Sequence, residues 1–217
     1  MESKSTKTIN SASVGILIPT INENTLEDVV SAITKQCLAA NVIVLGYGAS
    51  RQLAQTYDVD FLDFGQKTRK SIMLNYAIEH SDCENFIVLD ADTVPTDTWF
   101  SKMMDLFSQG HQIFSGAMNL SNGNFWMKVF NYSSLHEFAY QNPPSSRKHL
   151  ASFSLGFTKD FFNRNGGFDE SLMRCDDFEW SLRASSADET LFFSPDPVVN
   201  HYPINKSSLR SVLRYFI

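Results

Sequence analysis

Two carboxylates stand one residue apart in the segment FIVLDAD at residues 86–92. The apolar residues before them are typical of a buried strand, so Asp90 and Asp92 come just where that strand is expected to end. A divalent cation that binds a diphosphate needs carboxylate oxygens in such a fixed, partly dry position, because the cation neutralises the phosphates. The alternative is structural, since two aspartates can also cap a turn and the helix that follows Pro95. The spacing by itself leaves both interpretations open.

The elements that must position these carboxylates follow from the pattern of residues 14–92. Short apolar runs alternate there with stretches of helical period, which is typical of β-α-β units and a parallel sheet. Strands are predicted at residues 14–19, 41–45, 59–64 and 86–89, and helices from Asn24 and at residues 68–80. Each predicted strand ends in a polar or glycine-containing loop. Ligands bind at the carboxyl ends of parallel strands, so these four loops are expected to form one pocket around Asp90 and Asp92.

The second half of the chain has a less regular pattern. Asp97 is expected to cap a helix that buries Phe100, Met103, Met104 and Phe107. Further strands are predicted at residues 113–120 and 151–158, and helices at 125–140 and 176–184. A short strand at residues 191–193 is expected to end before Pro195 and Pro197.

The composition favours one globular domain. The chain has 217 residues, of which 43% are hydrophobic and 19% charged. A formal net charge of -6 argues against a broad basic surface, so no nucleic acid is expected as a partner. Cys37, Cys83 and Cys175 lie far apart, which favours free thiols in a reducing compartment and no zinc site. Residues 1–13 are expected to be a flexible polar N-terminus without a signal peptide, no apolar run is long enough to span a membrane, and a cytoplasmic location is predicted.

Several segments, in order along the chain, resemble the motifs of family-two glycosyltransferases of the GT-A fold. They are VGILIPTINE (residues 14–23), the segment 67–75 that ends in Asn75, the D-A-D of residues 90–92, GGFDE (166–170), DDFEWSLR (176–183) and VVNH (198–201). The resemblance implies an α/β fold, a GT-A-like Rossmann-type sandwich whose mostly parallel central sheet is flanked by helices. It also implies a single domain over residues 14–217, with a nucleotide-binding half at 14–95 and an acceptor-binding half at 96–217.

The resemblance implies a donor site for a nucleotide-diphosphate sugar, with a UDP-sugar as the first expectation. The nucleotide pocket would be lined, partly through backbone groups, by Pro19, Thr20 and Glu23. Asp90 would contact the ribose or the metal, with Ala91 beside it, and Asp92 would hold the Mn²⁺ or Mg²⁺ that bridges the diphosphate.

Other polar residues near the expected donor site have two interpretations each. His201 would be a further metal ligand or touch the phosphates, although a histidine before Tyr-Pro is otherwise a plain loop residue. Lys70, together with Lys67 and Arg69, crowds one loop and helix start, where it could meet the diphosphate or belong to a solvated face.

The family inverts the sugar's configuration, which requires a carboxylate base that takes the proton of the acceptor hydroxyl. The resemblance gives this role to Asp177, and places Asp176 and Trp180 at the acceptor. The alternative is that Asp176 and Asp177 only cap the helix that holds Trp180 and Arg183. Arg183 is expected to be a structural partner of acidic side chains.

One departure from the family pattern concerns the donor base. Where the family commonly has an acidic pair before its Gly-Ser, this chain reads GYGAS at residues 46–50. Tyr47 could stack on a base, and Asp63, at the end of the third predicted strand, could replace the missing carboxylate. The departure also leaves open a binding module that has lost activity.

The acceptor is expected to be a saccharide or a lipid-linked molecule, as is common in the family. At the C-terminus, apolar residues at helical spacing alternate with Arg210 and Arg214. This stripe suits a helix that closes the core, or a peripheral contact with anionic lipid at the inner face of the membrane.

Two other enzyme classes fit single features. The sequence LDADTV at residues 89–94 also fits the nucleophile loop of haloacid-dehalogenase-like phosphatases, but that family normally opens its core domain with this strand. Sugar nucleotidyltransferases need a glycine-rich loop directly after the first strand, and residues 18–22 contain no glycine. A metal-dependent inverting glycosyltransferase is therefore the preferred interpretation.

Overall fold

The computed structural model describes residues 13–21, 24–36 and 40–216, and one mixed sheet extends through this part of the protein. The strand order is β3-β2-β1-β4-β8-β6-β9-β5, with β7 paired to β9. The strands are β1 (Val14–Pro19), β2 (Asn41–Gly46), β3 (Asp60–Asp63), β4 (Asn85–Leu89), β5 (Thr93–Pro95), β6 (Ile113–Asn119), β7 (Ser145–Arg147), β8 (Ser154–Thr158) and β9 (Leu191–His201). Six of them run in one direction, whereas β5, β7 and β8 run in the other. The predicted α/β sheet with mostly parallel strands is confirmed.

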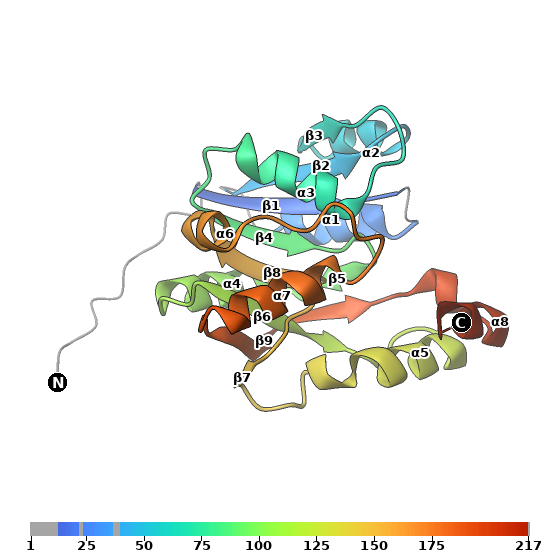
Figure 1. Ribbon diagram of the computed structural model, residues 1–217. Helices are drawn as coiled ribbons and strands as arrows, with labels where there is room; N and C mark the ends of the chain where they lie inside the picture. Colours follow the sequence, from blue (N-terminus) through green and yellow to red (C-terminus); the bar gives the residue numbers. More distant parts are fainter. Residues whose placement is uncertain (1–12, 22–23, 37–39, 217) are drawn as a thin grey trace.

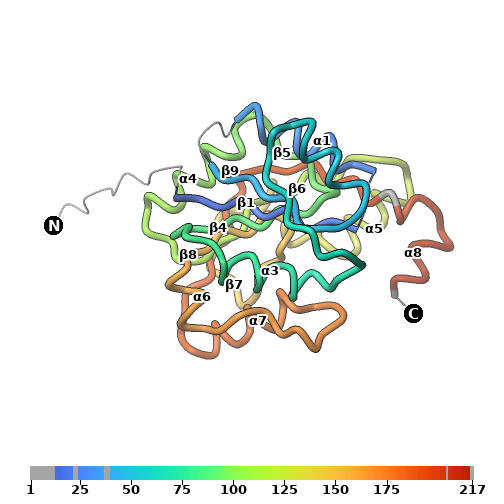
Figure 2. The backbone as a smooth tube through the Cα atoms, turned by 90° about the horizontal axis from the view of Figure 1, so that it is seen from above, coloured from blue at the N-terminus to red at the C-terminus, as the bar shows by residue number. Residues whose placement is uncertain are grey.

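Helices cover both faces of this sheet. Their bounds are α1 (Leu26–Thr34), α2 (Ser50–Thr56), α3 (Lys70–Glu79), α4 (Trp99–Ser108), α5 (Phe125–Leu135), α6 (Lys159–Asn165), α7 (Asp176–Ser186) and α8 (Leu209–Phe216), with short 3₁₀ turns η2 (His136–Phe138) and η3 (Ile204–Lys206). Figures 1 and 2 show α3, α6 and α7 on one face and α1 and α4 on the other, with α5 and α8 near one end of the sheet.

The first half follows the apolar pattern closely. All residues of β1 and β4 are buried, because helices cover both faces of these central parallel strands. Helix α1 begins at Leu26 after Thr25, so Asn24 is not its cap. Helix α2 was not predicted, because its polar sequence buries only Ser50 and Ala54. Cys37 lies outside the described residues.

Strand β9 is much longer than the predicted segment 191–193. It runs from Leu191 through Pro195 and Pro197 to His201. Its register on β6 shifts between the pairs Phe193↔Ser115 and Val198↔Ala117, so both prolines fall in a bulge where no ladder hydrogen bond needs their missing N–H. Gly116 makes room for this bulge, since a Cβ there would lie 2.5 Å from the Pro197 carbonyl oxygen.

Strand β8 brings the second half of the chain to the edge where β4 ends. It is antiparallel to β4, with Ser154 opposite Leu89. Residues 151–153, which were predicted as strand, therefore lie beside Asp90, and the Asp90 N–H donates to the Phe153 carbonyl at 3.3 Å. Two other boundaries differ from prediction: α5 ends at Leu135, and α4 begins after Thr98, with no side-chain cap from Asp97.

Candidate active site

Asp90 is part of a network that joins α3, β4 and the start of β8. The Lys70 ammonium, at the first residue of α3, forms an ion pair with Asp90 and donates to the Ser152 hydroxyl at 2.9 Å. Burial lowers the pKa of Lys70, but the charges of Asp90 and Asp177 outweigh it and raise the pKa overall. Lys70 is therefore a charged residue held inside the site, and not part of a solvated face.

Ser152 connects this network to Asp177. Its backbone N–H and its hydroxyl each donate to Asp177 Oδ2 at 2.9 Å, while Asp177 Oδ1 accepts from the Phe178 N–H at 2.8 Å. No sequence motif predicts this role for Ser152. Ser154, two residues on, has the same pattern but accepts from the Trp99 indole N–H in the core.

The second carboxylate, Asp92, faces His201. Strands β5 and β9 pair antiparallel with Thr93 opposite His201, and the Tyr202 N–H donates to the Asp92 carbonyl at 2.9 Å. This ladder places His201 Nε2 3.5 Å from Asp92 Oδ2. The two side chains come from residues more than one hundred positions apart in the sequence, and they meet because their strands are neighbours.

A buried amide fixes the tautomer of His201. The Asn131 amide donates to the Leu120 carbonyl at 3.3 Å, which turns its oxygen toward His201 Nδ1 at 2.7 Å. Nδ1 therefore carries a proton, and in the neutral form of the imidazole the lone pair of Nε2 faces the Asp92 carboxylate. A nitrogen lone pair and a carboxylate repel each other unless a cation lies between them, and imidazole with carboxylate is a donor set that Mn²⁺ accepts. The residues thus fit a divalent ion, although no group of three or more His, Cys, Asp or Glu side chains arranged for a metal occurs in the described part of the chain.

One cavity of about 320 Å³ brings the predicted chemical residues together. It opens at the edge of the sheet where β4 ends, and the residues of its lining that bear on the chemistry are Asp90, Asp92, Ser152, Asp177, His201, Phe130, Lys206 and Tyr215. This volume lies within the range of small-molecule sites. Three carboxylates in one cavity, beside an oriented histidine, can hold a cation and accept a proton.

Of the residues predicted to contact the nucleotide, Pro19, Thr20, Tyr47 and Ala91 lie outside this lining. Pro19 and Thr20 are buried at the end of β1, where the Thr20 N–H donates to the Leu45 carbonyl at 2.8 Å. Tyr47 is half-buried directly after β2. Glu23 falls outside the described residues. Ala91 is 3% exposed, so it offers a ligand little more than backbone.

The departure at residues 46–48 has a structural counterpart. A Cβ on Gly46 would lie 2.8 Å from the Thr20 methyl group, so the approach of β1 leaves no room for a side chain there. Asp63 is engaged nearby: it accepts from the Gly65 N–H at 2.8 Å and forms an ion pair with Arg51. These contacts lower the pKa of Asp63 and hold it at the β3 edge.

Trp180, predicted to contact the acceptor, is instead a core residue. It is 0% exposed, and its indole N–H donates to the Gly166 carbonyl at 2.7 Å. Its ring packs on Phe157, Phe161, Phe162 and Phe168, so it fixes α7 from the inside. Arg183 has the predicted structural role, with its Nε 2.8 Å from Glu179 Oε1.

Asp176 has a poorly solvated carboxylate. Its Oδ2 is buried and has no hydrogen-bond partner among the residues that the structure describes. Burial raises its pKa; the Lys70 ammonium opposes this, and the neighbouring Asp177 adds to it. The folded protein therefore prefers the neutral acid of Asp176 more than the unfolded chain does.

Asp176→Asn is expected to stabilise the fold at pH 7 by about 1 kcal/mol, because a neutral amide replaces a poorly solvated carboxylate. The folded-state pKa lies above the unfolded value of about 3.9. The gain should therefore disappear as pH falls below that value, where both states of the wild type are protonated. Urea unfolding at pH 7 and pH 3.5 measures it, with the exposed Asp160→Asn as control. A gain that persists unchanged at pH 3.5 would contradict the explanation.

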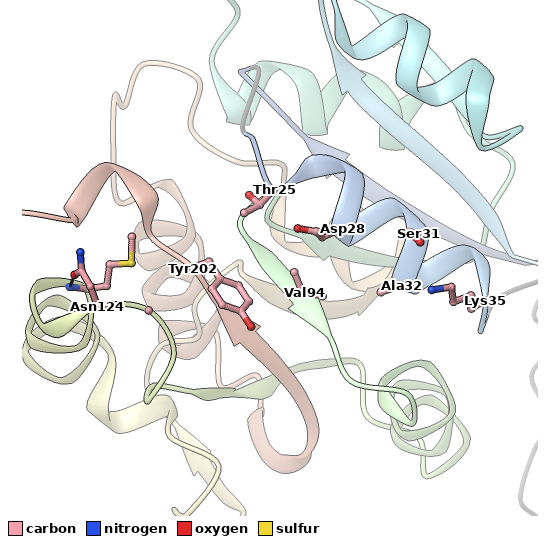
Figure 3. Close-up of a pocket in the computed structure, with 10 residues that line it drawn as sticks. Thr25, Asp28, Ser31, Ala32, Lys35, Val94, Asn124 and Tyr202 are labelled. Atoms are coloured by element: carbon pink, nitrogen blue, oxygen red, sulfur yellow. Dashed lines mark hydrogen bonds between the residues drawn. The ribbon is translucent and has the colours of Figure 1, made fainter.

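A second cavity, of about 570 Å³, is lined by residues of α1, by Tyr202 after β9 and by Asn124 before α5 (Figure 3). One wall is the polar side of α1, with Asp28, Ser31 and Lys35, and the floor includes Tyr202. None of the predicted site residues that the structure describes lines it. The Thr25 hydroxyl, at the head of α1, donates to the Ala91 carbonyl at 2.7 Å and so supports the D-A-D loop from this side.

The sheet order, with Asp90 and Asp92 at the end of β4, matches the GT-A fold that the sequence motifs predict. The sequence model of glycosyl transferase family 2 matches residues 15–174, and the chain belongs to this family. No helix in the described residues is both long enough and apolar enough to cross a membrane.

Proteins that are similar to this chain include the following. Glycosyltransferase AglE of Haloferax volcanii is 23% identical over 201 residues, which cover 87% of this chain and 66% of that protein. The crystal structure of S. aureus TarS 1-349 superposes with a TM-score of 0.69 at 14% identity, covering 93% of this chain and 63% of that one. The mannosyltransferase PcManGT of Pyrobaculum calidifontis, in complex with GDP-Man and Mn²⁺, gives 0.67 at 18% identity, with 98% and 63% covered. The chain thus spans less than two thirds of each of these proteins.

Proposed function

We propose that this protein transfers a sugar from a nucleotide-diphosphate sugar to an acceptor hydroxyl, with inversion at the anomeric carbon. The observation that carries the proposal is the single cavity that holds Asp90, Asp92, Asp177 and His201. Membership of the family supports glycosyl transfer. The acceptor we propose is a saccharide or a lipid-linked molecule.

A divalent ion, Mn²⁺ or Mg²⁺, would be held by Asp92 and His201. The distance between their facing atoms and the hydrogen bond that orients the imidazole support this assignment. PcManGT was solved with GDP-Man and Mn²⁺, which makes Mn²⁺ the first ion to test. When bound, the ion would neutralise the diphosphate and its developing charge. Asp90, tied to Lys70, would serve the ribose side of the same donor.

Asp177 is the proposed base. Ser152 holds Asp177 Oδ2 with two hydrogen bonds, and the carboxylate lines the same cavity as Asp92. In this position it can accept the acceptor's proton while the acceptor oxygen attacks the anomeric carbon. Asp176 lies next to it and would face the acceptor side.

Thermal unfolding with UDP, GDP, CDP and dTDP, each with and without Mn²⁺, tests which nucleobase the donor carries. A metal-dependent stabilisation by one of them, followed by release of that nucleotide from its sugar conjugate when an acceptor is added, supports the function. UDP is our first expectation. Failure of all four to stabilise the protein would favour a binding module that has lost activity, the alternative raised by Gly46.

We also propose a peripheral contact with an anionic membrane on its cytoplasmic face. Helix α8 exposes Leu209 and Leu213, with Arg210 and Arg214 beside them. Apolar and cationic groups on one helix suit the lipid interface. Flotation with phosphatidylserine vesicles is expected to carry the wild type. Equal flotation of Leu209→Ser/Leu213→Ser would refute this contact.

A further inference from the structure

The cavity that holds the carboxylates also has one cation at its rim. Asp90, Asp92 and Asp177 give the lining three negative groups, and Lys70 is already paired with Asp90. Among the described lining residues Lys206 carries the remaining full positive charge. A diphosphate entering so acidic a site needs positive groups to offset the repulsion.

Lys206 is held in place without being neutralised. It ends the 3₁₀ turn η3, where its N–H donates to the Pro203 carbonyl at 2.7 Å. Its ammonium lies 5.5 Å from the ring centroid of Phe130 and 5.1 Å from that of Tyr215. In the described part of the chain, no carboxylate lies within ion-pair distance of it. Aromatic faces attract a cation but leave its charge and its hydrogen-bond donors available to a ligand.

A second contact joins both walls of the cavity at the same ring. The guanidinium of Arg174, in the loop before α7, lies 5.4 Å from the Tyr215 ring centroid. Tyr215 also packs edge-on against Phe130 at 4.9 Å. The turn that carries Lys206 is therefore braced by α5, by α8 and by the loop that leads to Asp177.

We infer that Lys206 binds the diphosphate of the donor and stabilises the leaving nucleoside diphosphate. The inference rests on the proposed function. In the transfer, the bond between the anomeric carbon and the phosphate oxygen breaks, and its electron pair stays on that oxygen. The acceptor oxygen forms the new bond, and its proton passes to Asp177. Lys206 would donate to the phosphate oxygens, where the negative charge increases.

The test measures binding by calorimetry, with Mn²⁺ and the best-bound of UDP, GDP, CDP and dTDP. The matching nucleoside monophosphate and inorganic pyrophosphate are titrated in parallel. Lys206→Gln and Lys206→Met are expected to weaken the nucleoside diphosphate and pyrophosphate roughly ten- to hundredfold, as for the loss of a charge-assisted hydrogen bond. The monophosphate should change by less than about threefold on the same scale, and Lys206→Arg should restore most of the affinity. Lys128→Gln, on an exposed residue of α5, is the control of equal charge change.

The outcomes separate this inference from the function it rests on. Wild-type affinity in both neutral variants, or equal weakening of monophosphate and diphosphate, would overturn the role of Lys206 while leaving the transferase in place. A wild type that binds neither nucleotides nor pyrophosphate would overturn the proposed function itself. The melting temperature of each variant shows whether it is folded. Of the two neutral replacements, methionine keeps an apolar side chain packed against Phe130 and Tyr215.

Discussion

Asp92→Asn is expected to abolish the metal-dependent stabilisation of the protein by its nucleotide. In the wild type, a nucleoside diphosphate at one hundred times its Kd adds about 2.7 kcal/mol, a shift in Tm of roughly 5 to 10 °C for a chain of this size. The amide keeps the shape of Asp92 but removes the charge that faces His201 Nε2. Without that charge the cation loses its only carboxylate in this pair, and kcat/KM should fall by about three orders of magnitude.

The control for Asp92 is Asp97→Asn, an exposed aspartate five residues further along the chain. It should leave both the shift and the activity unchanged. His201→Gln should lower the affinity for Mn²⁺ about ten- to hundredfold, because it removes one of the two proposed protein ligands of the ion. An Asp92→Asn protein that keeps the Mn²⁺-dependent shift would place the metal elsewhere.

Asp177→Asn is expected to lower kcat by about 10² to 10⁴, the contribution of a general base, while nucleotide affinity stays within about twofold. The reason is that the proposed base and the proposed metal ligands are held by different elements of the cavity. Asp177 is held by Ser152 on the α7 side, whereas Asp92 and His201 are held by the β5–β9 ladder. Steady-state kinetics and calorimetry on the same preparation separate the two quantities.

The neighbouring carboxylate makes this result specific. Asp160→Asn, on the surface of α6, is expected to behave as wild type in both measurements. If Asp177→Asn stayed active while Asp176→Asn lost kcat, the base would be Asp176. Loss of nucleotide affinity in Asp177→Asn would instead indicate that this residue serves the donor.

The first half of the fold could be predicted because its apolar runs are short and clear. Once the strands ending at Pro19 and Leu89 were known to be parallel, the rule that ligands bind at carboxyl ends placed Asp90 and Asp92 correctly. Asp177 and His201 needed the family resemblance, since nothing local in either segment shows that α7 and β9 bring them to the same edge of the sheet. In the structure all four line one cavity.

The site residues that could not be predicted from the sequence owe their positions to contacts with residues far away in the chain. Ser152 is one of two serines in an apolar run, and only the antiparallel pairing of β8 tells the site serine from the core serine. Lys206 is the last residue of an ordinary 3₁₀ turn, and the aromatic rings that contact it belong to Phe130 and Tyr215 on other elements. The prediction for Trp180 was wrong for a different reason. An aromatic residue near a catalytic motif gives the same sequence pattern whether its side chain faces a sugar or the core. The predicted length of β9 was too short because the two prolines alone do not reveal that the strand continues through a bulge.

The insertion of β8 between β4 and β6 also affects how the chain folds as it leaves the ribosome. Strand β4 is fully buried in the finished protein, but the neighbour on its open side is made only when residue 158 has been added. Until then, residues 14–95 carry an apolar strand with an unpaired edge, the kind of surface that recruits other nascent chains. We therefore expect the two halves around residue 95 to fold as one cooperative unit, and we expect a truncated first half to aggregate through β4.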